Sequence, residues 1–357
     1  MSNVVHGGNV EELSRKYNLK KENIIDFSAN INPLGVSDSV KKSIIEAINE
    51  IKIYPDITYY NLKNSISIYE KINSNYITLG NGAAEVIFNL VRVINPKKGL
   101  VLAPTFGEYE EALLSIDSEI EYYYLKEGNN WNIEQDIIEY IKDDIDIIFI
   151  CNPNNPSGNL TNKELILKLL KKALKTNTIV AIDESFLDFV KDNNKYSSLE
   201  FIEEYKNLFI IKSLTKFFAI PGLRIGYGIS SNKNLLDKFK SISVPWNINV
   251  LAEKSAISAL KEEDYIKNTI EYIEKEKDNF YYELNKFNDL KVFKPSVNYI
   301  MFKIKRDIDL KEEMLKENIL IRSCSNYNGL NKYFYRIAVK TKEENLKFIK
   351  LLKKILE

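Results

Sequence analysis

Lys216 lies between two hydroxyl side chains, Ser213 and Thr215, and Arg224 follows eight residues later. A lysine amine can form an imine with an aldehyde, while hydroxyl groups and a guanidinium supply the hydrogen bonds and charge that a buried phosphate requires. The flanking segments are apolar and are typical of buried strands. Because a lysine between two buried strands needs a chemical partner, the pattern favours a pyridoxal phosphate site over an unrelated surface lysine and arginine.

Two further motifs place polar residues at the ends of predicted strands. The apolar run 145–150 leads into Asn-Pro-Asn-Asn-Pro-Ser-Gly at 152–158, a rigid turn whose side-chain amides can face a ligand. The run 178–182 ends at Asp183 and Glu184, and open α/β sheets carry binding groups at such strand ends. Each motif alone is also compatible with an ordinary strand followed by a polar loop.

The order and spacing of the three motifs resemble fold-type I pyridoxal phosphate enzymes of the aminotransferase class I/II superfamily. The resemblance implies an α/β fold, with a large domain on a mostly parallel seven-stranded sheet and a small α+β domain. It also implies that Lys216 is the catalytic lysine that binds the cofactor, that Asp183 contacts the pyridine nitrogen, and that Asn155 donates to the phenolic oxygen. A carboxylate beside the pyridine nitrogen keeps it protonated, which makes the ring an electron sink.

The same resemblance implies further cofactor contacts from several segments. These are Asn81, Gly82 and Ala83 at the N-terminus of a predicted helix, Phe106 on the ring face, Ser213, Thr215 and Arg224 at the phosphate, and Tyr54 reaching the phosphate from a neighbouring subunit. A helix N-terminus favours an anion because its backbone N–H groups are free. Phe106 is also compatible with a core aromatic residue. The role of Tyr54 implies a homodimer.

Phe186 departs from the pattern of the nearest aminotransferases, which carry a tyrosine three residues after the aspartate. Phenylalanine cannot donate a hydrogen bond to the phenolic oxygen of the cofactor, so Asn155 is the side-chain donor that remains there. This departure weakens the inference of aminotransferase chemistry.

Two arginines near the C-terminus are candidates for binding a substrate. Arg336 occupies the position of the family arginine that pairs with a substrate carboxylate, and a bidentate guanidinium suits that role. Arg322 is either a second substrate-binding cation or a surface ion-pair residue. Two arginines indicate two anionic groups, as in an amino acid phosphate. His6, the only histidine, precedes two glycines that permit close approach of backbone to ligand, although a lone histidine near a terminus often has no role.

Four segments, at 6–9, 26–35, 213–224 and 319–327, together resemble the threonine-phosphate decarboxylase family of cobalamin biosynthesis, and the likeness spans essentially the whole chain. It implies decarboxylation of L-threonine O-3-phosphate to aminopropanol phosphate and carbon dioxide. The implied substrate-binding residues are His6, Asn30 and Arg322 at the phosphate, Arg336 and Asn155 at the carboxylate, and Gly35 in the N-terminal arm.

The choice of reaction stays open at this point, because decarboxylation and transamination differ in which bond at the α-carbon stands perpendicular to the cofactor ring. Histidinol-phosphate aminotransferase is the alternative enzyme, and a pyridoxal-binding protein without catalysis is a third possibility. Threonine phosphate and serine phosphate differ by one methyl group, which changes affinity by only about 1 to 3 kcal/mol.

Seven strand-like runs alternate with helical stretches, which predicts a largely parallel sheet. The runs are 76–79, 99–103, 120–125, 145–151, 178–182, 208–212 and 224–229. We expect an N-terminal arm and part of the small domain at 1–48, the large cofactor-binding domain at 49–245, interdomain helices at 246–287 and the C-terminal small domain at 288–357.

Composition narrows the class of partner. Lys plus Arg and Asp plus Glu number 50 each in 357 residues, so no basic excess favours nucleic acid or anionic membranes, and small molecules are the expected ligands. The sequence has only two cysteines, which predicts a protein without a disulfide framework. It shows no basic and apolar leader and no apolar run near the roughly 20 residues of a membrane span, so we expect a cytoplasmic protein. No metal site is expected.

Overall fold

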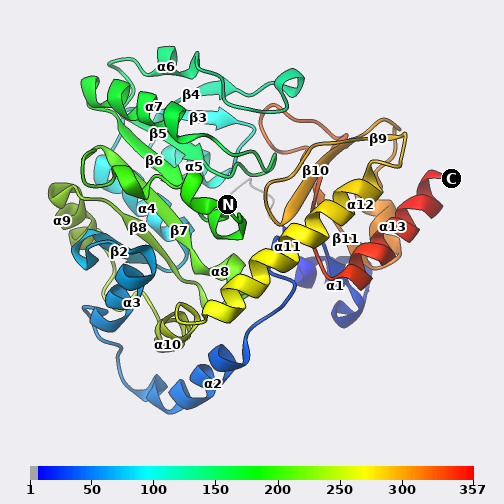
Figure 1. Cartoon of the computed structure of the whole chain (residues 1–357), viewed down its shortest axis with the longest axis horizontal. Coiled ribbons are helices and arrows are strands. Elements are labelled where there is room, and N and C mark those ends of the chain that lie inside the picture. The colour runs from blue at the N-terminus through cyan, green and yellow to red at the C-terminus, as the bar shows by residue number, and fades with distance from the viewer. Residues whose placement is uncertain (1–6) are drawn as a thin grey trace.

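Within residues 7–357, which the computed structural model describes, the largest element is a seven-stranded sheet of order β2-β8-β7-β6-β5-β3-β4 (Figure 1). Only β8 runs against its neighbours, which confirms the predicted mostly parallel sheet. The strands are β2 (Ile77–Gly80), β3 (Lys98–Ala103), β4 (Glu119–Tyr124), β5 (Ile147–Cys151), β6 (Ile179–Asp183), β7 (Leu208–Ser213) and β8 (Gly226–Ile229).

Helices cover both faces of this sheet, because successive strand residues point to opposite sides. Ala181 packs in one cluster with α4 (Ala83–Ile94), α5 (Glu108–Leu114) and α9 (Lys233–Ile242). Val180 and Ile182 pack in the other with α3 (Tyr60–Glu70) and α7 (Lys163–Lys175). Two one-turn helices complete this region, α6 (Ile137–Tyr140) and α8 (Leu214–Phe217). Both faces of the sheet are therefore apolar, as its continuous hydrophobic strands require.

A second, antiparallel sheet of order β12-β13-β10-β9 forms the smaller unit. Its elements are β9 (Leu290–Val292), β10 (Tyr299–Ile304), β12 (Arg322–Ser323), β13 (Phe334–Ala338), α12 (Leu310–Lys316) and α13 (Lys342–Leu356). The N-terminal segment joins it, since β1 (Ile25–Asp26) pairs with β11 (Ile319–Leu320), and Leu13 of α1 (Val10–Tyr17) packs on Leu315 and Leu320. This arrangement supports placing part of the N-terminal arm in the small domain, while the exact domain boundaries stay a prediction.

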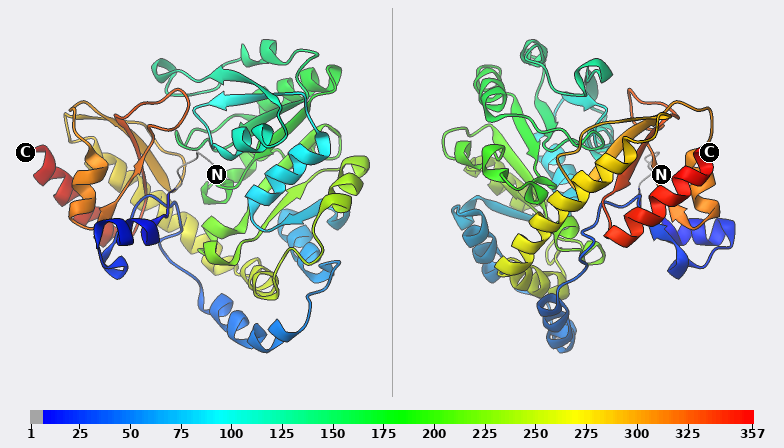
Figure 2. Two further views of the ribbon diagram at one scale, coloured as in Figure 1. Left: turned by 180° about the vertical axis from the view of Figure 1, so that it is seen from behind. Right: turned by 45° about the vertical axis from the view of Figure 1, so that its right-hand side comes forward.

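Two helices lie within 246–287, the segment expected to link the domains. These are α10 (Val250–Ala259), against which α2 (Asp38–Ala47) packs, and the long α11 (Glu263–Leu284). Figure 2 shows α11 running from the large sheet towards the small one, with α1 beside α12 and α13. None of the helices in the described residues is both long and apolar enough to cross a bilayer.

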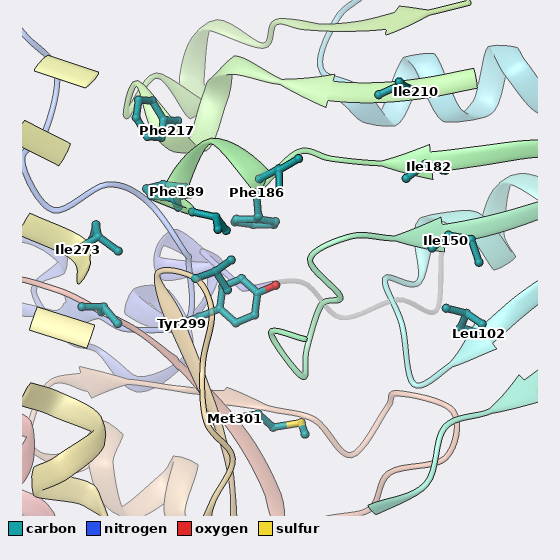
Figure 3. Packing of buried hydrophobic residues seen from close by; sticks show 14 of the residues in the cluster. Leu102, Ile150, Ile182, Phe186, Phe189, Ile210, Phe217, Ile273, Tyr299 and Met301 are labelled. Carbon is teal, nitrogen blue, oxygen red and sulfur yellow. The ribbon is translucent and has the colours of Figure 1, made fainter. Parts of the chain in front are cut away.

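Aromatic side chains fill the space between the two units (Figure 3). The ring of Phe186 meets Tyr299 of β10 edge-on, with centroids 5.1 Å apart, and stacks on Phe189 at 6.3 Å. Phe189 in turn lies 5.0 Å from Phe217 of α8. Because such pairs add about 0.5–1.5 kcal/mol each beyond their buried area, this cluster fixes the small sheet relative to the strand ends of the large one.

Candidate active site

A cavity of about 720 Å³ lies where the ends of β5, β6 and β7 face the small sheet. It brings together most of the residues that the sequence singles out, although they come from segments far apart in the chain. The predicted residues that line it are Asn30, Ala83, Phe106, Asn155, Asp183, Ser213, Thr215, Lys216, Arg224, Arg322 and Arg336. Their convergence supports one shared binding site.

Lys216 is held at this cavity by the short helix α8 that follows β7. Ser213 caps α8 by accepting a hydrogen bond from the Thr215 amide, and the two hydroxyl oxygens lie 2.8 Å apart. The Lys216 Nζ donates to Thr215 Oγ1 at 2.8 Å. Burial, assisted by the charge of Arg224, lowers the pKa of Lys216 to about 8. The amine is therefore easily deprotonated near neutral pH, as a nucleophile requires.

Asp183 ends β6 as a buried carboxylate with two fixed hydrogen bonds. Its Oδ2 accepts from the Tyr109 hydroxyl at 2.8 Å, and its Oδ1 accepts from the Ser185 amide at 2.9 Å. Burial raises the pKa of Asp183, while these bonds and the charge of Lys216 oppose the rise. Tyr109, on α5, was not predicted from the sequence. A buried carboxylate held in this way fits a partner of a protonated ring nitrogen.

Asn155 and Arg336 are joined directly. The Arg336 Nη1 donates to Asn155 Oδ1 at 2.5 Å, and Nη2 donates to the Ser28 carbonyl at 2.7 Å. The Tyr327 hydroxyl also donates to Asn155 Oδ1, at 3.2 Å. Since its oxygen is occupied twice, the Asn155 amide nitrogen is the part of that side chain left to donate to a ligand.

Arg322 and Arg336 are direct register partners on β12 and β13. Both are buried, 6% and 5% exposed, and among residues 7–357 neither forms an ion pair with a carboxylate. Burial, together with the charge of Arg336, lowers the pKa of Arg322. Opposed like charges on neighbouring strands destabilise a sheet, and buried charges need compensation. The pair is therefore a candidate anion-binding site, and the burial of Arg322 argues against a surface ion pair.

Asn30 lies beside this site with an unused acceptor. Its Oδ1 is buried and makes no hydrogen bond within the described chain, while its backbone carbonyl accepts from Asn298 Nδ2 at 3.0 Å. Buried side-chain polar atoms are nearly always paired. An anionic phosphate cannot donate to this oxygen, so a role for Asn30 at a phosphate rests on its amide nitrogen.

Four predicted residues lie outside the lining of the cavity. Tyr54 is 77% exposed and stacks on Trp246 at 4.5 Å. The Gly35 carbonyl accepts from Tyr265 at 2.7 Å. The backbone N–H of Asn81 donates to Glu85 Oε2 at 2.6 Å and is therefore not free for a phosphate. Gly82 lies behind the Arg224 guanidinium. His6 is outside the residues that the structure describes.

Ser28, Tyr109 and Tyr327 are site residues that the motifs did not reveal. Ser28 ties the arm to Arg336, because its hydroxyl accepts from the Gly8 amide at 2.8 Å and donates to Asp26 at 2.6 Å. Each of these residues acts through a contact with a partner far along the chain. Ser28 and Tyr327 lie within segments, 26–35 and 319–327, that the resemblance had singled out, whereas Tyr109 does not.

The donors at the cavity fit a phosphorylated pyridine aldehyde. A Cβ atom at Gly82 would lie 2.4 Å from Arg224 Nη2, so glycine leaves the space in which this guanidinium sits at the N-terminus of α4. Ser213, Thr215 and Arg224 thus surround a place suited to a phosphate. Lys216 and Asp183 line the same cavity. The model of the family described as aminotransferase class I and II matches residues 22–352.

The chain belongs to the aminotransferase class I and II family. Among curated relatives, a threonine-phosphate decarboxylase of Salmonella typhimurium is 33% identical over 99% of this chain and 97% of its own. A solved structure of a histidinol-phosphate aminotransferase from Clostridium acetobutylicum is 40% identical, with a TM-score of 0.87, over 92% and 98% of the two chains. An L-threonine-O-3-phosphate decarboxylase structure from Porphyromonas gingivalis is 27% identical, with a TM-score of 0.82, over the same shares.

Proposed function

We propose that this protein binds pyridoxal 5′-phosphate on Lys216 and decarboxylates L-threonine O-3-phosphate. The observation that carries the proposal is the pair Arg322 and Arg336, buried on neighbouring strands with no carboxylate partner within residues 7–357 and lining one cavity with the lysine. Two uncompensated cations suit a substrate with a carboxylate and a phosphate. The decarboxylase relatives from Salmonella typhimurium and Porphyromonas gingivalis support the same reading, and a place in cobalamin biosynthesis is proposed with it.

The cofactor would be held by residues whose positions fit it. Ser213, Thr215 and Arg224, with the N-terminus of α4, would bind the phosphate, and Asp183 would pair with the ring nitrogen. When bound, the cofactor supplies an electron sink for the electron pair left at the substrate's α-carbon. Burial raises the pKa of Asp183, but a cationic ring nitrogen would offset that effect and keep the carboxylate charged.

The substrate would be held at both ends. Arg336 and the Asn155 amide nitrogen would bind the carboxylate, while Arg322 and Asn30, with His6 from outside the described residues, would bind the phosphate. Such a clamp would fix the rotation about the α-carbon and so select the bond to the carboxylate as the one that breaks. The carboxylate would leave as carbon dioxide, and Lys216 Nζ would return a proton to the α-carbon.

Phe186 supports decarboxylation over transamination. It lines the cavity, and its ring packs edge-on against Tyr299, so the position three residues after Asp183 offers no hydroxyl. The second candidate is a histidinol-phosphate aminotransferase, which the 40% identical Clostridium acetobutylicum structure favours. Its substrate also carries a phosphate, so the arginines alone do not separate the two enzymes.

We also propose that the protein is a cytoplasmic homodimer in which Tyr54 reaches the partner's cofactor phosphate. Exposed apolar side chains gather along α2, α3 and the segments next to them, and patches of this kind mark interfaces. They are Ile45, Ile48, Ile51, Ile53, Tyr54, Ile57, Tyr60, Ile68, Val244 and Trp246. Light scattering should give about twice the chain mass of 41.4 kDa. A hybrid of Lys216→Ala and Tyr54→Phe chains should regain one site with both native residues.

The decisive experiment supplies L-threonine O-3-phosphate to the purified holoprotein without any keto acid. Decarboxylation returns the cofactor to its aldehyde form, so carbon dioxide should be released over many turnovers. A transaminase would instead stop after one turnover, with the cofactor as its amine, until 2-oxoglutarate is added. Histidinol phosphate with 2-oxoglutarate is the matched comparison, and rapid turnover of that pair without carbon dioxide release would overturn the proposal.

A further inference from the structure

The side chain of Tyr327 touches three of the residues assigned to ligands. Its hydroxyl donates to Asn155 Oδ1 at 3.2 Å and lies 3.5 Å from Arg336 Nη1. Its ring lies under the Arg322 guanidinium, with 5.2 Å between the centroid and Cζ. No other contact in the described chain joins these three side chains through one residue.

The ring of Tyr327 faces Arg322, whereas the hydroxyl pairs with Asn155 and Arg336 and also lies within the electrostatic reach of Arg322. The Arg322 guanidinium donates to the Ser323 carbonyl at 2.7 Å and to Asn326 Oδ1 at 2.8 Å. These two bonds hold its edge, and the Tyr327 ring packs against its face. A ring face attracts a cation and keeps its plane in place. The hydroxyl acts instead on the pair of Asn155 and Arg336, where it competes for the same amide oxygen.

We propose that Tyr327 is a positioning residue that orients both buried arginines, so that each binds a different anionic group of one substrate. Its ring orients Arg322 for the phosphate, and its hydroxyl orients Asn155 and Arg336 for the carboxylate. This inference rests on the proposed function for the identity of the two anions, but not on the reaction that follows.

The hydroxyl remains a donor in this arrangement. Burial raises the pKa of Tyr327, partly offset by the charge of Arg336, so the phenol stays protonated over the working pH range. A protonated phenol can donate to Asn155 Oδ1 while it accepts from Arg336 Nη1. This double role fixes the amide orientation that leaves the Asn155 nitrogen free.

The test separates the ring from the hydroxyl with two variants and two probes, each of which carries only one of the two anionic groups. Tyr327→Phe keeps the ring, Tyr327→Leu removes it, and Tyr333→Phe is the control, because the Tyr333 hydroxyl bonds Asp307 at the surface. Ethanolamine phosphate carries a phosphate without a carboxylate, and L-threonine carries a carboxylate without a phosphate. The dissociation constant of each probe is measured from the change in visible absorbance of the holoprotein.

Tyr327→Phe should weaken L-threonine about tenfold, the effect of losing a hydrogen bond in a charged network, and leave ethanolamine phosphate within about twofold. Tyr327→Leu should weaken both probes, ethanolamine phosphate by about three- to tenfold. Tyr333→Phe should change neither. Equal losses for both probes in Tyr327→Phe, or unchanged phosphate binding in Tyr327→Leu, would overturn the proposal. Circular dichroism would reveal whether Tyr327→Leu fails to fold. In that case the comparison of the two probes in Tyr327→Phe, which lacks only the hydroxyl oxygen, still tests the proposal.

The outcome is separable from the proposed reaction. Wild-type protein that binds both probes and shows the expected split, yet releases no carbon dioxide from L-threonine O-3-phosphate, would refute the decarboxylation and leave the role of Tyr327 standing. Carbon dioxide release with no split between the variants would do the reverse. Wild-type protein that binds neither probe would refute both assignments.

Discussion

Gly82 and Arg224 are packed so closely that a side chain at position 82 has no room. A Cβ atom there would approach Arg224 Nη2 to 2.4 Å, and the backbone of Gly82 has φ +85°, a conformation that residues with side chains rarely adopt. The contact places the guanidinium directly over the N-terminus of α4. The Arg224 guanidinium and the N-terminus of α4 therefore lie together, where both can bind the proposed phosphate.

Gly82→Ala should weaken cofactor binding about tenfold or more, because Arg224 must move away from the phosphate position and the backbone is strained. The dissociation constant of pyridoxal 5′-phosphate, measured by absorbance titration of cofactor-free protein, checks this. Gly128→Ala is the control, because a Cβ atom at Gly128 meets nothing within 4 Å. Equal affinities for the two variants would show that Arg224 does not bind the phosphate.

Local patterns in the sequence predicted the elements that carry the cofactor residues. Lys216 follows β7 directly and Asp183 ends β6, so strand periodicity and motif spacing were enough to place both at one edge of the sheet. The same patterns gave the seven strands, because each is a short apolar run bounded by polar residues. The helix α1 and the pairing of β1 with β11 were not predicted, because β1 and β11 are only two residues long and α1 lies in a segment expected only to form an N-terminal arm.

The contacts that orient the site could not be predicted, because they join residues far apart in the chain. Tyr109 lies 74 residues from Asp183, and Ser28 lies 308 residues from Arg336. Neither pair shares a motif or a helical face. Which phenol reaches which carboxylate depends on how the sheets pack, and periodicity carries no information about that.

Arg322→Ala should discriminate between ligands that carry a phosphate and those that do not. The affinity for L-threonine O-3-phosphate should fall about tenfold or more, since a charge-assisted bond to the phosphate is lost, while the affinity for L-threonine should change little. Arg306→Ala is a suitable control, because Arg306 pairs with Asp289 at the surface. A matching loss for both ligands would place Arg322 elsewhere than at the phosphate.

Lys212 neutralises a buried acidic cluster on the sheet face opposite Asp183. Its Nζ lies 3.2 Å from Glu70, 3.4 Å from Asp188 and 3.9 Å from Glu184. Although burial opposes its charge, these carboxylates raise the pKa of Lys212 well above its usual value. Burial also raises the pKa values of Glu70 and Glu184. Among the described residues, Lys212 is the one cation that pairs with these three carboxylates, so the stability of the cluster depends on it.

Lys212→Met should lower the free energy of unfolding by about 3–5 kcal/mol, the usual cost of leaving buried charges unpaired. Urea denaturation at pH 7 measures this loss. Lys233→Met, which breaks an exposed pair with Asp237, should have little effect. The loss should shrink in acid, because protonation of the carboxyl groups removes the unpaired charge. A loss as small as that of Lys233→Met would show that the cluster is neutral in the native protein.

The low pKa of Lys216 is a cost to the stability of the cofactor-free protein. The amine titrates at about 8 when folded against 10.5 in its reference state, and each pH unit is worth about 1.4 kcal/mol. Below pH 8 the whole cost, about 3 kcal/mol, is present. Between pH 8 and 10.5 the unfolded chain binds more protons than the folded one, so the stability of the wild-type protein rises with pH in that window.

Lys216→Met should therefore make the cofactor-free protein more stable at pH 7 while abolishing turnover. Methionine fills nearly the same space without a charge, and it gives up only the 2.8 Å bond to Thr215. Denaturation after removal of the cofactor should show a gain of about 3 kcal/mol at pH 7 that falls towards zero near pH 10.5. Lys175→Met, at an exposed position of α7, should leave the pH dependence unchanged. A gain that is the same at pH 7 and pH 10 would mean that the Lys216 amine is not desolvated, and its readiness to act as a nucleophile would need another cause.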